Sequence, residues 1–211
     1  MRNHKRCVII GGAGISDYGL ARGYIREDDY VIYCDSGLRH MDGLGVRPSL
    51  IIGDFDSHED PHMDVETITL PVAKDDTDTV FAAKTGMERG FREFLLLGAI
   101  GERFDHSLVN AYILTMLADR DCRGVIVDDY SEMELICEGG EAFVPDSYPF
   151  FSLVALEGPA KGVSISGAKF CLDDARIGPD YQYATSNEAL PGQQARITLK
   201  EGRLLLIKDR V

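Results

Sequence analysis

The 211-residue sequence predicts two folds in one chain: an α/β domain over residues 1–130, with an open, mainly parallel sheet and flanking helices, and an all-β sandwich over residues 131–211. Three observations predict this. Short unbroken apolar runs, typical of strands buried on both faces of a parallel sheet, recur in the first part. Segments with helical spacing of apolar residues lie between these runs. After about residue 129, strand-like segments succeed one another with turn residues between them.

The predicted strands of the first part mostly end at glycine or aspartate. They cover residues 7–10, 30–34, 50–52, 65–70, 94–97 and 124–127. In the segment at 65–70, apolar and polar residues alternate more than in the others, and Pro71 follows it. The run at 7–10 comes after the basic start MRNHKR, but glycines and then Ser16-Asp17 break the apolar stretch. We therefore interpret it as a core strand rather than a signal peptide.

Two helices are predicted between these strands, at 77–89 and 107–117. Thr77 or Asp78 is the N-cap of the first, and Gly90 ends it. In the second part, strands are predicted at 134–137, 147–155, 162–165, 196–199 and 204–208. Glycine, proline, aspartate and asparagine separate them, which favours a small antiparallel sandwich or barrel.

Composition excludes several classes of partner. The chain carries 22 Lys and Arg against 35 Asp and Glu, a net charge of −13. A nucleic-acid binder or a protein of anionic membrane surfaces needs the opposite balance. Nothing approaches the roughly 20 apolar residues of a membrane span. The five cysteines are scattered without CxxC spacing, which indicates reduced thiols in a cytoplasmic protein rather than disulfides or a zinc site.

Acidic residues gather where the predicted parallel strands end. In an open parallel sheet, ligands bind beyond the carboxyl ends of the strands. So many carboxylates at one edge cannot all stay ionised without cations, and hard oxygen ligands select Mg²⁺. A magnesium-bound phosphate compound is therefore the predicted ligand of this edge. The acids concerned are Asp35, Asp54, Asp56, Asp75, Asp76, Asp78 and Asp105.

Each motif taken singly also has a plain structural interpretation. The segment 11–14 is either a tight strand-to-helix turn or a ligand loop, and no GxxxxGK[ST] supports a P-loop. An isolated Asp-x-Asp, as at 54–56, also occurs in many proteins where it binds no metal. The segment 74–79 is either a capped helix start or a phosphate site. An isolated histidine such as His106 is more often structural than catalytic, although here it lies close in sequence to Arg103 and Asp105.

The motifs in their order are more specific. The segments CDSG, RPSLIIGDFDS, KDDTDT and GAIGERFDHSLVN, with GAKF and TSNE late in the chain, resemble those of thiamine pyrophosphokinases from about residue 7 to residue 207. The resemblance implies an α/β catalytic domain, a β-sandwich for thiamine binding and dimerisation, and a homodimer with sites at its interface. The implied reaction is transfer of the pyrophosphoryl group of ATP to the hydroxyl of thiamine, with Mg²⁺, giving AMP and thiamine diphosphate.

The resemblance also implies roles for single residues. Asp54, Asp56 and Asp78 would hold Mg²⁺ and form the catalytic centre. The nucleotide side would consist of Asp35, Lys74, Thr77, Arg103, Asp105 and His106. Of these, Arg103 suits a bidentate grip on phosphate, and Lys74 matches no fixed family residue. Ser186 and Asn187 would bind thiamine, from the partner subunit.

Two positions depart from the family pattern. The chain has no tryptophan to stack on thiamine, so Phe170, Tyr181 or Tyr183 would supply any aromatic face. Ser36 replaces a usual glycine, and its side chain could narrow the approach of a ligand to the backbone.

Two alternative functions fit part of the pattern. A phosphatase of the haloacid-dehalogenase type also has an apolar strand ending in Asp-x-Asp, where the first aspartate is the nucleophile. That family does not require the later KDDTDT and RFDH motifs. The other alternative is a non-catalytic module that binds nucleotide or thiamine, which the complete acidic set argues against.

Overall fold

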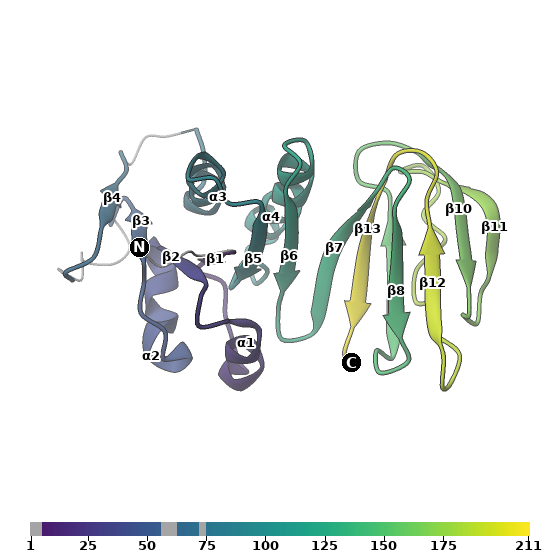
Figure 1. Cartoon of the computed structure of the whole chain (residues 1–211), viewed down its shortest axis with the longest axis horizontal. Coiled ribbons are helices and arrows are strands. Elements are labelled where there is room, and N and C mark those ends of the chain that lie inside the picture. Colours follow the sequence, from purple (N-terminus) through teal and green to yellow (C-terminus); the bar gives the residue numbers. More distant parts are fainter. Residues whose placement is uncertain (1–5, 56–62, 72–74) are drawn as a thin grey trace. The chain divides into compact units, whose positions relative to one another are not determined.

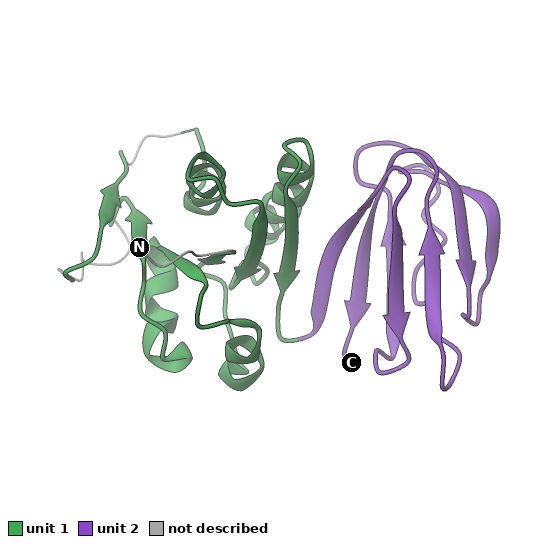
Figure 2. Cartoon of the chain, viewed as in Figure 1, with its two compact units in different colours: residues 1–129 green, residues 130–211 purple. Residues whose placement is uncertain are grey.

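The computed structural model describes residues 6–55, 63–71 and 75–211. The chain divides into two compact units, residues 1–129 and 130–211 (Figure 2). Among the described residues, no helix combines the length and apolar character that crossing a membrane requires.

The first unit is built on a parallel sheet with the described strand order β4-β3-β2-β1-β5-β6. Each neighbouring pair in this order is parallel. The sheet grows outward in both directions from β1, so β1 and β5 form the point where the strand order reverses, the usual ligand site of such sheets. The strands are β1 (Cys7–Ile10), β2 (Tyr30–Cys34), β3 (Leu50–Gly53), β4 (Thr67–Thr69), β5 (Glu93–Leu97) and β6 (Arg123–Val127).

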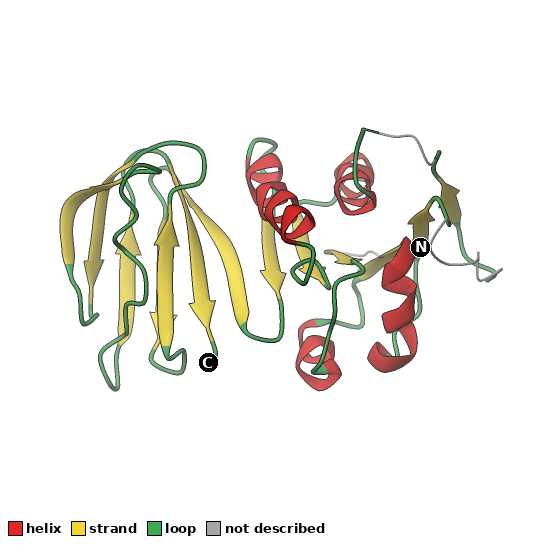
Figure 3. Ribbon diagram, turned by 180° about the vertical axis from the view of Figure 1, so that it is seen from behind, coloured by secondary structure: helices red, strands yellow, loops and turns green. Residues whose placement is uncertain are grey.

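Helices cover both faces of this sheet (Figures 1 and 3). The helices α1 (Tyr18–Tyr24) and α2 (Met41–Leu44) lie on one face, and α3 (Asp78–Glu88) and α4 (Phe104–Ala118) lie on the other. A 3₁₀ helix, η1 (Asp35–His40), joins β2 to α2. Every residue of β1 and β3 is buried because helices pack on both sides, which explains the unbroken apolar runs.

The predicted helices are present, and the largest difference in their bounds is at the start of α4. α3 begins after Thr77, one of the two N-caps that the sequence left open, and Thr77 Oγ1 accepts a hydrogen bond from the Val80 amide at 3.3 Å. α4 begins at Phe104, earlier than the predicted start at 107, because the apolar pattern used for the prediction is absent from its exposed first turn. The short elements α1, η1 and α2 were not predicted.

The second unit consists of antiparallel strands in two groups. β13 pairs with β7 and with β9, while β10 pairs with β11 and β12, and β12 pairs with β8. A buried core that includes Phe151, Val163 and Leu206 lies between the groups, so the predicted α/β-then-β fold is confirmed. The strands are β7 (Ser131–Cys137), β8 (Glu141–Pro145), β9 (Phe150–Val154), β10 (Ala160–Ser166), β11 (Leu172–Ile177), β12 (Gln194–Thr198) and β13 (Arg203–Asp209).

Candidate active site

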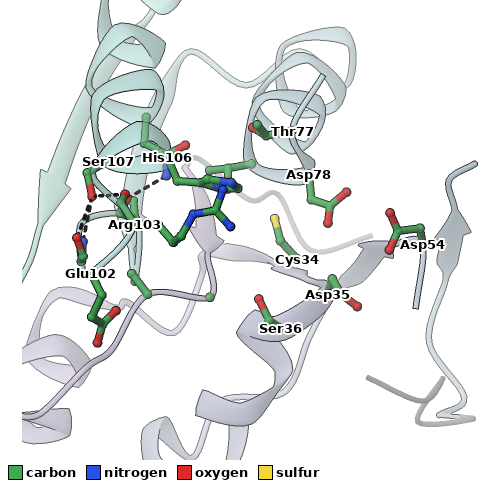
Figure 4. A pocket seen from close by; sticks show the side chains of 17 residues that line it. Cys34, Asp35, Ser36, Asp54, Thr77, Asp78, Glu102, Arg103, His106 and Ser107 are labelled. Atoms are coloured by element: carbon green, nitrogen blue, oxygen red, sulfur yellow. Dashed lines mark hydrogen bonds between the residues drawn. The ribbon is translucent and has the colours of Figure 1, made fainter. Parts of the chain in front are cut away.

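A cavity of about 390 Å³ opens at the carboxyl ends of the parallel strands (Figure 4). Segments that come after β1, β2, β3 and β5 line it, together with the first turns of α3 and α4. This is the edge at which the sequence placed its acidic motifs. The cavity is formed within the first unit.

The glycine loop, residues 11–14, comes directly after β1 and lies against the end of β5. The amide of Gly11 donates to the Leu97 carbonyl at 2.8 Å, and the amide of Ala13 donates to the Gly98 carbonyl at 2.8 Å. A Cβ on Gly11 would lie 2.4 Å from the Gly98 oxygen, so only glycine allows the two backbones to come this close. The loop therefore forms part of the cavity wall through Gly12 and Ala13.

Three aspartates line the cavity: Asp35 at the start of η1, Asp54 after β3, and Asp78 in the first turn of α3. The carboxylates of Asp54 and Asp78 turn toward one another (Figure 4). The Oδ1 atoms of Asp35 and Asp78 are buried. Within the part of the chain that the structure describes, no three His, Cys, Asp or Glu side chains form a group that could hold a metal ion.

The other predicted acids differ in position. Asp56 lies outside the described residues, and so does the predicted cation Lys74. Asp76 does not line the cavity; it accepts two hydrogen bonds from Lys84 Nζ, at 2.6 and 2.8 Å, which anchors the chain ahead of α3. Asp75 does not line the cavity either. Asp76 therefore supports the start of α3 rather than the cavity.

Hydrogen-bond donors come from the start of α4. Arg103 and His106 line the cavity, as does Thr77, the N-cap of α3. Asp105 does not line it; its carboxylate accepts two hydrogen bonds from Arg103, at 2.7 and 3.0 Å. This pairing holds the pKa of Asp105 well below its usual range, and both side chains are largely exposed. In this structure Asp105 therefore orients Arg103.

Some lining residues carried no assignment from the sequence. Ser107 Oγ accepts from the Gly101 amide at 3.0 Å, and Asn110 Nδ2 donates to the Ala99 carbonyl at 2.7 Å. Both side chains tie the loop after β5 to α4. They belong to the motif GAIGERFDHSLVN, where their polar character within a helix was the available signal. Cys34 and Ser36 also line the cavity.

In the second unit, Ser186 and Asn187 lie in a loop that holds Phe170. Asn187 is buried; its Oδ1 accepts from the Phe170 amide at 3.0 Å, and its Nδ2 donates to the Phe170 carbonyl at 2.8 Å. The ring of Phe170 stays 58% exposed. Ser186 is exposed and adopts a left-handed backbone with φ 54°. Asn187 is thus engaged in positioning Phe170.

Comparison with protein families gives two matches along the chain. The model for the thiamin pyrophosphokinase catalytic domain matches residues 21–126, half of the chain. The chain belongs to the thiamin pyrophosphokinase family. The model for the vitamin B1 binding domain of thiamin pyrophosphokinase matches residues 142–204. The resemblance drawn from the sequence motifs is confirmed, and the chain is an enzyme of this family.

Solved structures agree with the family assignment. The thiamine pyrophosphokinase from Bacillus subtilis has a TM-score of 0.86 at 21% identity, covering 98% of this chain and 100% of that one. The thiamin pyrophosphokinase from Geobacillus thermodenitrificans has a TM-score of 0.82 at 26% identity, covering 97% of each chain. The thiamin pyrophosphokinase from Candida albicans has a TM-score of 0.75 at 14% identity, covering 98% of this chain and 89% of that one. A search of curated protein sequences returned no match.

Proposed function

We propose that the cavity at the carboxyl ends of the strands binds ATP as its magnesium complex, and that the pyrophosphoryl group passes from it to the hydroxyl of thiamine. The observation that carries this proposal is the arrangement of the cavity. Aspartates from three segments lie on one side of it, and Arg103 and His106 lie on the other. A metal-bound triphosphate needs carboxylates to hold the metal and hydrogen-bond donors to hold the phosphate oxygens.

The donor chemistry of the cavity suits Mg²⁺. Carboxylate oxygens are the protein ligands that this ion prefers, and it keeps several waters and phosphate oxygens besides. Asp54 and Asp78 would hold it, together with Asp56 by its place in the motif. The ion would neutralise charge on the transferred group when bound.

The described residues orient the nucleotide. Arg103 donates to Asp105 through Nε and Nη2, and this ion pair holds the guanidinium so that its Nη1 side can donate to phosphate oxygens. Thr77 and Asp35 border the same space, and Lys74 adds a cation by its place in the sequence. The thiamine oxygen attacks the β-phosphorus, the bond from that phosphorus to the α-phosphate oxygen breaks, and AMP leaves with the electron pair. One of the cavity carboxylates accepts the proton of the hydroxyl.

Thiamine would contact the loop around Ser186 in the second unit. Of the three aromatic residues left open by the sequence, Phe170 has the strongest support, because Asn187 holds its backbone on both sides while its ring stays exposed. Tyr181 and Tyr183 contact each other, with ring centroids 4.8 Å apart. We therefore assign thiamine hydrogen bonding to Ser186 and the aromatic face to Phe170, with Asn187 supporting both.

The same proposal includes a homodimer with sites shared between subunits, and a cytoplasmic location. All five cysteines are free thiols, which suits a reducing compartment.

One incubation tests the function. The protein with Mg²⁺, ATP and thiamine should yield AMP and thiamine diphosphate, identified by mass. Release of inorganic phosphate from a monoester through a phosphoenzyme would favour the phosphatase instead. Binding of both substrates without AMP would favour the non-catalytic module.

A further inference from the structure

The glycine loop, residues 11–14, is held from two sides. On the sheet side, its amides bind carbonyls of β5 and of the residue directly after it. On the other side, η1 presents two side chains to its carbonyl oxygens. Arg39 Nη2 donates to the Gly12 carbonyl, and His40 Nε2 lies 2.8 Å from the Ala13 carbonyl. The loop is therefore fixed at consecutive peptide groups.

The partners of His40 indicate which ring nitrogen carries the hydrogen when the imidazole is neutral. The Ala13 oxygen, 2.8 Å from Nε2, only accepts and therefore favours a hydrogen on Nε2, while Arg39 Nε lies farther from the same nitrogen, at 3.4 Å. His40 Nδ1 lies 2.9 Å from the Tyr18 hydroxyl, which donates to it when the imidazole is neutral. His40 is 2% exposed, and this burial lowers its pKa. Tyr18, at the start of α1, thus orients an imidazole that in turn binds the glycine loop.

The contacts of the loop leave its carbonyl oxygens engaged on the side of η1. The Ala13 amide, which shares a peptide plane with the Gly12 oxygen, is bound to the Gly98 carbonyl. Gly12 and Ala13 line the cavity, whereas Arg39 and His40 do not. The two side chains therefore draw two carbonyl oxygens away from the space proposed for the triphosphate. Carbonyl oxygens turned toward that space would repel phosphate, because the oxygen is the negative end of the peptide dipole.

We infer that Arg39 and His40 are positioning residues for nucleotide binding, which act by holding the Gly12 and Ala13 carbonyls outside the cavity. This inference rests on the proposed function, because it takes ATP as the ligand. It predicts an effect on MgATP and none of comparable size on thiamine.

The test compares variants that keep or lose the donor at each position. His40→Leu removes the donor, and His40→Gln keeps an amide hydrogen near Nε2. Arg39 is exposed, so Arg39→Ala removes the second donor without opening the core. Leu44→Ala is the control for stability, because Leu44 is buried in α2 and its apolar side chain donates no hydrogen bond to the loop. KM and kcat for both substrates and the melting temperature are measured for each.

We expect His40→Leu and Arg39→Ala to raise KM for MgATP by about 5- to 10-fold, the effect of one lost hydrogen bond, with KM for thiamine within about twofold. His40→Gln should restore most of the affinity. Leu44→Ala should lower the melting temperature with KM for MgATP unchanged.

Two failures are distinguishable. If the wild-type chain forms no AMP, the proposed function fails and takes this inference with it. If the wild type is active but Arg39→Ala and His40→Leu keep the wild-type KM for MgATP, only the inference is overturned. It is also overturned if His40→Gln is as impaired as His40→Leu, or if both substrates are affected equally. Should His40→Leu not fold, the Arg39→Ala result decides.

Discussion

At the residue scale, Asp54 and Asp78 carry the sharpest prediction. Their carboxylates turn toward one another at the same side of the cavity (Figure 4), and replacement by asparagine keeps the shape while removing the charge. We expect Asp54→Asn or Asp78→Asn to lower the rate of AMP formation on the order of 100-fold or more, with the fold retained by circular dichroism. Asp42→Asn, the same change at an exposed residue of α2, is the control and should keep full activity. Near-wild-type turnover in either cavity variant would contradict the metal assignment.

Ser186 is the residue whose substitution should affect thiamine binding without affecting MgATP binding. Its hydroxyl is exposed beside the loop that holds Phe170, and it lies in the unit that matches a vitamin B1 binding domain. Ser186→Ala should therefore raise KM for thiamine by about fivefold, the effect of one hydrogen bond, and leave KM for MgATP nearly unchanged. Steady-state kinetics with each substrate varied in turn gives both values. Equal losses for the two substrates would mean that the thiamine site has been assigned to the wrong loop.

His40 links stability to pH. The Tyr18 hydroxyl, the Ala13 carbonyl and the Arg39 guanidinium face its ring, and burial lowers its pKa from 6.5. Below pH 6.5 the unfolded chain binds a proton at His40 that the folded chain resists, so the free energy of unfolding falls as the pH decreases through that window. Above it, this contribution is constant. Urea unfolding between about pH 5 and 8 should show a steeper acid loss for the wild type than for His40→Gln, which lacks the titrating group. Parallel curves would contradict the buried neutral imidazole.

At the element scale, η1 is the short segment on which the site depends. It begins with Asp35, contains Ser36 at the cavity wall, and ends with the two residues that bind the glycine loop. A 3₁₀ helix has about three residues per turn, so Ser36 and Arg39 share a face, and both approach Gly12. A Cβ on Gly12 would lie 1.9 Å from Ser36 Oγ, so the serine at this position occupies space beside the glycine.

Gly37 tests how closely η1 packs. A Cβ there would lie 2.2 Å from the Ile10 carbonyl oxygen, a backbone atom that cannot move aside easily. Gly37→Ala should destabilise the fold by about 1–3 kcal/mol through overpacking, measured by urea unfolding. Gly23→Ala in α1 is the matched control, because a Cβ added at Gly23 would have no atom within 4 Å. That change should stabilise the protein by about 0.5–1 kcal/mol. Equal effects of the two substitutions would show that η1 does not pack against β1.

The elements differ in how well the sequence predicted them. α3 and α4 were predicted because each is long enough to show helical spacing, and α3 has a side-chain cap at Thr77. α1, η1 and α2 have seven, six and four residues, too short for a periodic pattern to develop. Tertiary packing against the sheet stabilises such short helices, so their local sequence carries little signal.

At the scale of the whole molecule, catalytic turnover should depend on the proposed homodimer. If each site combines the cavity of one subunit with the Ser186 loop of its partner, dissociation should abolish turnover. Sedimentation velocity across a dilution series, with activity measured at each concentration, should show loss of AMP formation in parallel with loss of the dimer. A monomer that stays fully active at assay concentration would contradict the shared site. Added ATP and thiamine should restore the dimer at the lowest concentrations, because both would bridge the subunits.

The sequence by itself determined the local properties of this chain: apolar runs long enough for strands buried on two faces, acids at the ends of those strands, a charge of −13, and the ordered motifs of one enzyme family. Tertiary structure alone decided which of these residues meet. The reversal of strand order at β1 and β5 joins the glycine loop to Gly98, and η1 brings Arg39 and His40 to carbonyls 27 residues away. It also separated Asp76, bound to Lys84, from the aspartates of the cavity. The physical reason is that periodicity reports the burial of a residue within its own element, whereas contacts between elements depend on strand order and on backbone approach, which no local pattern encodes.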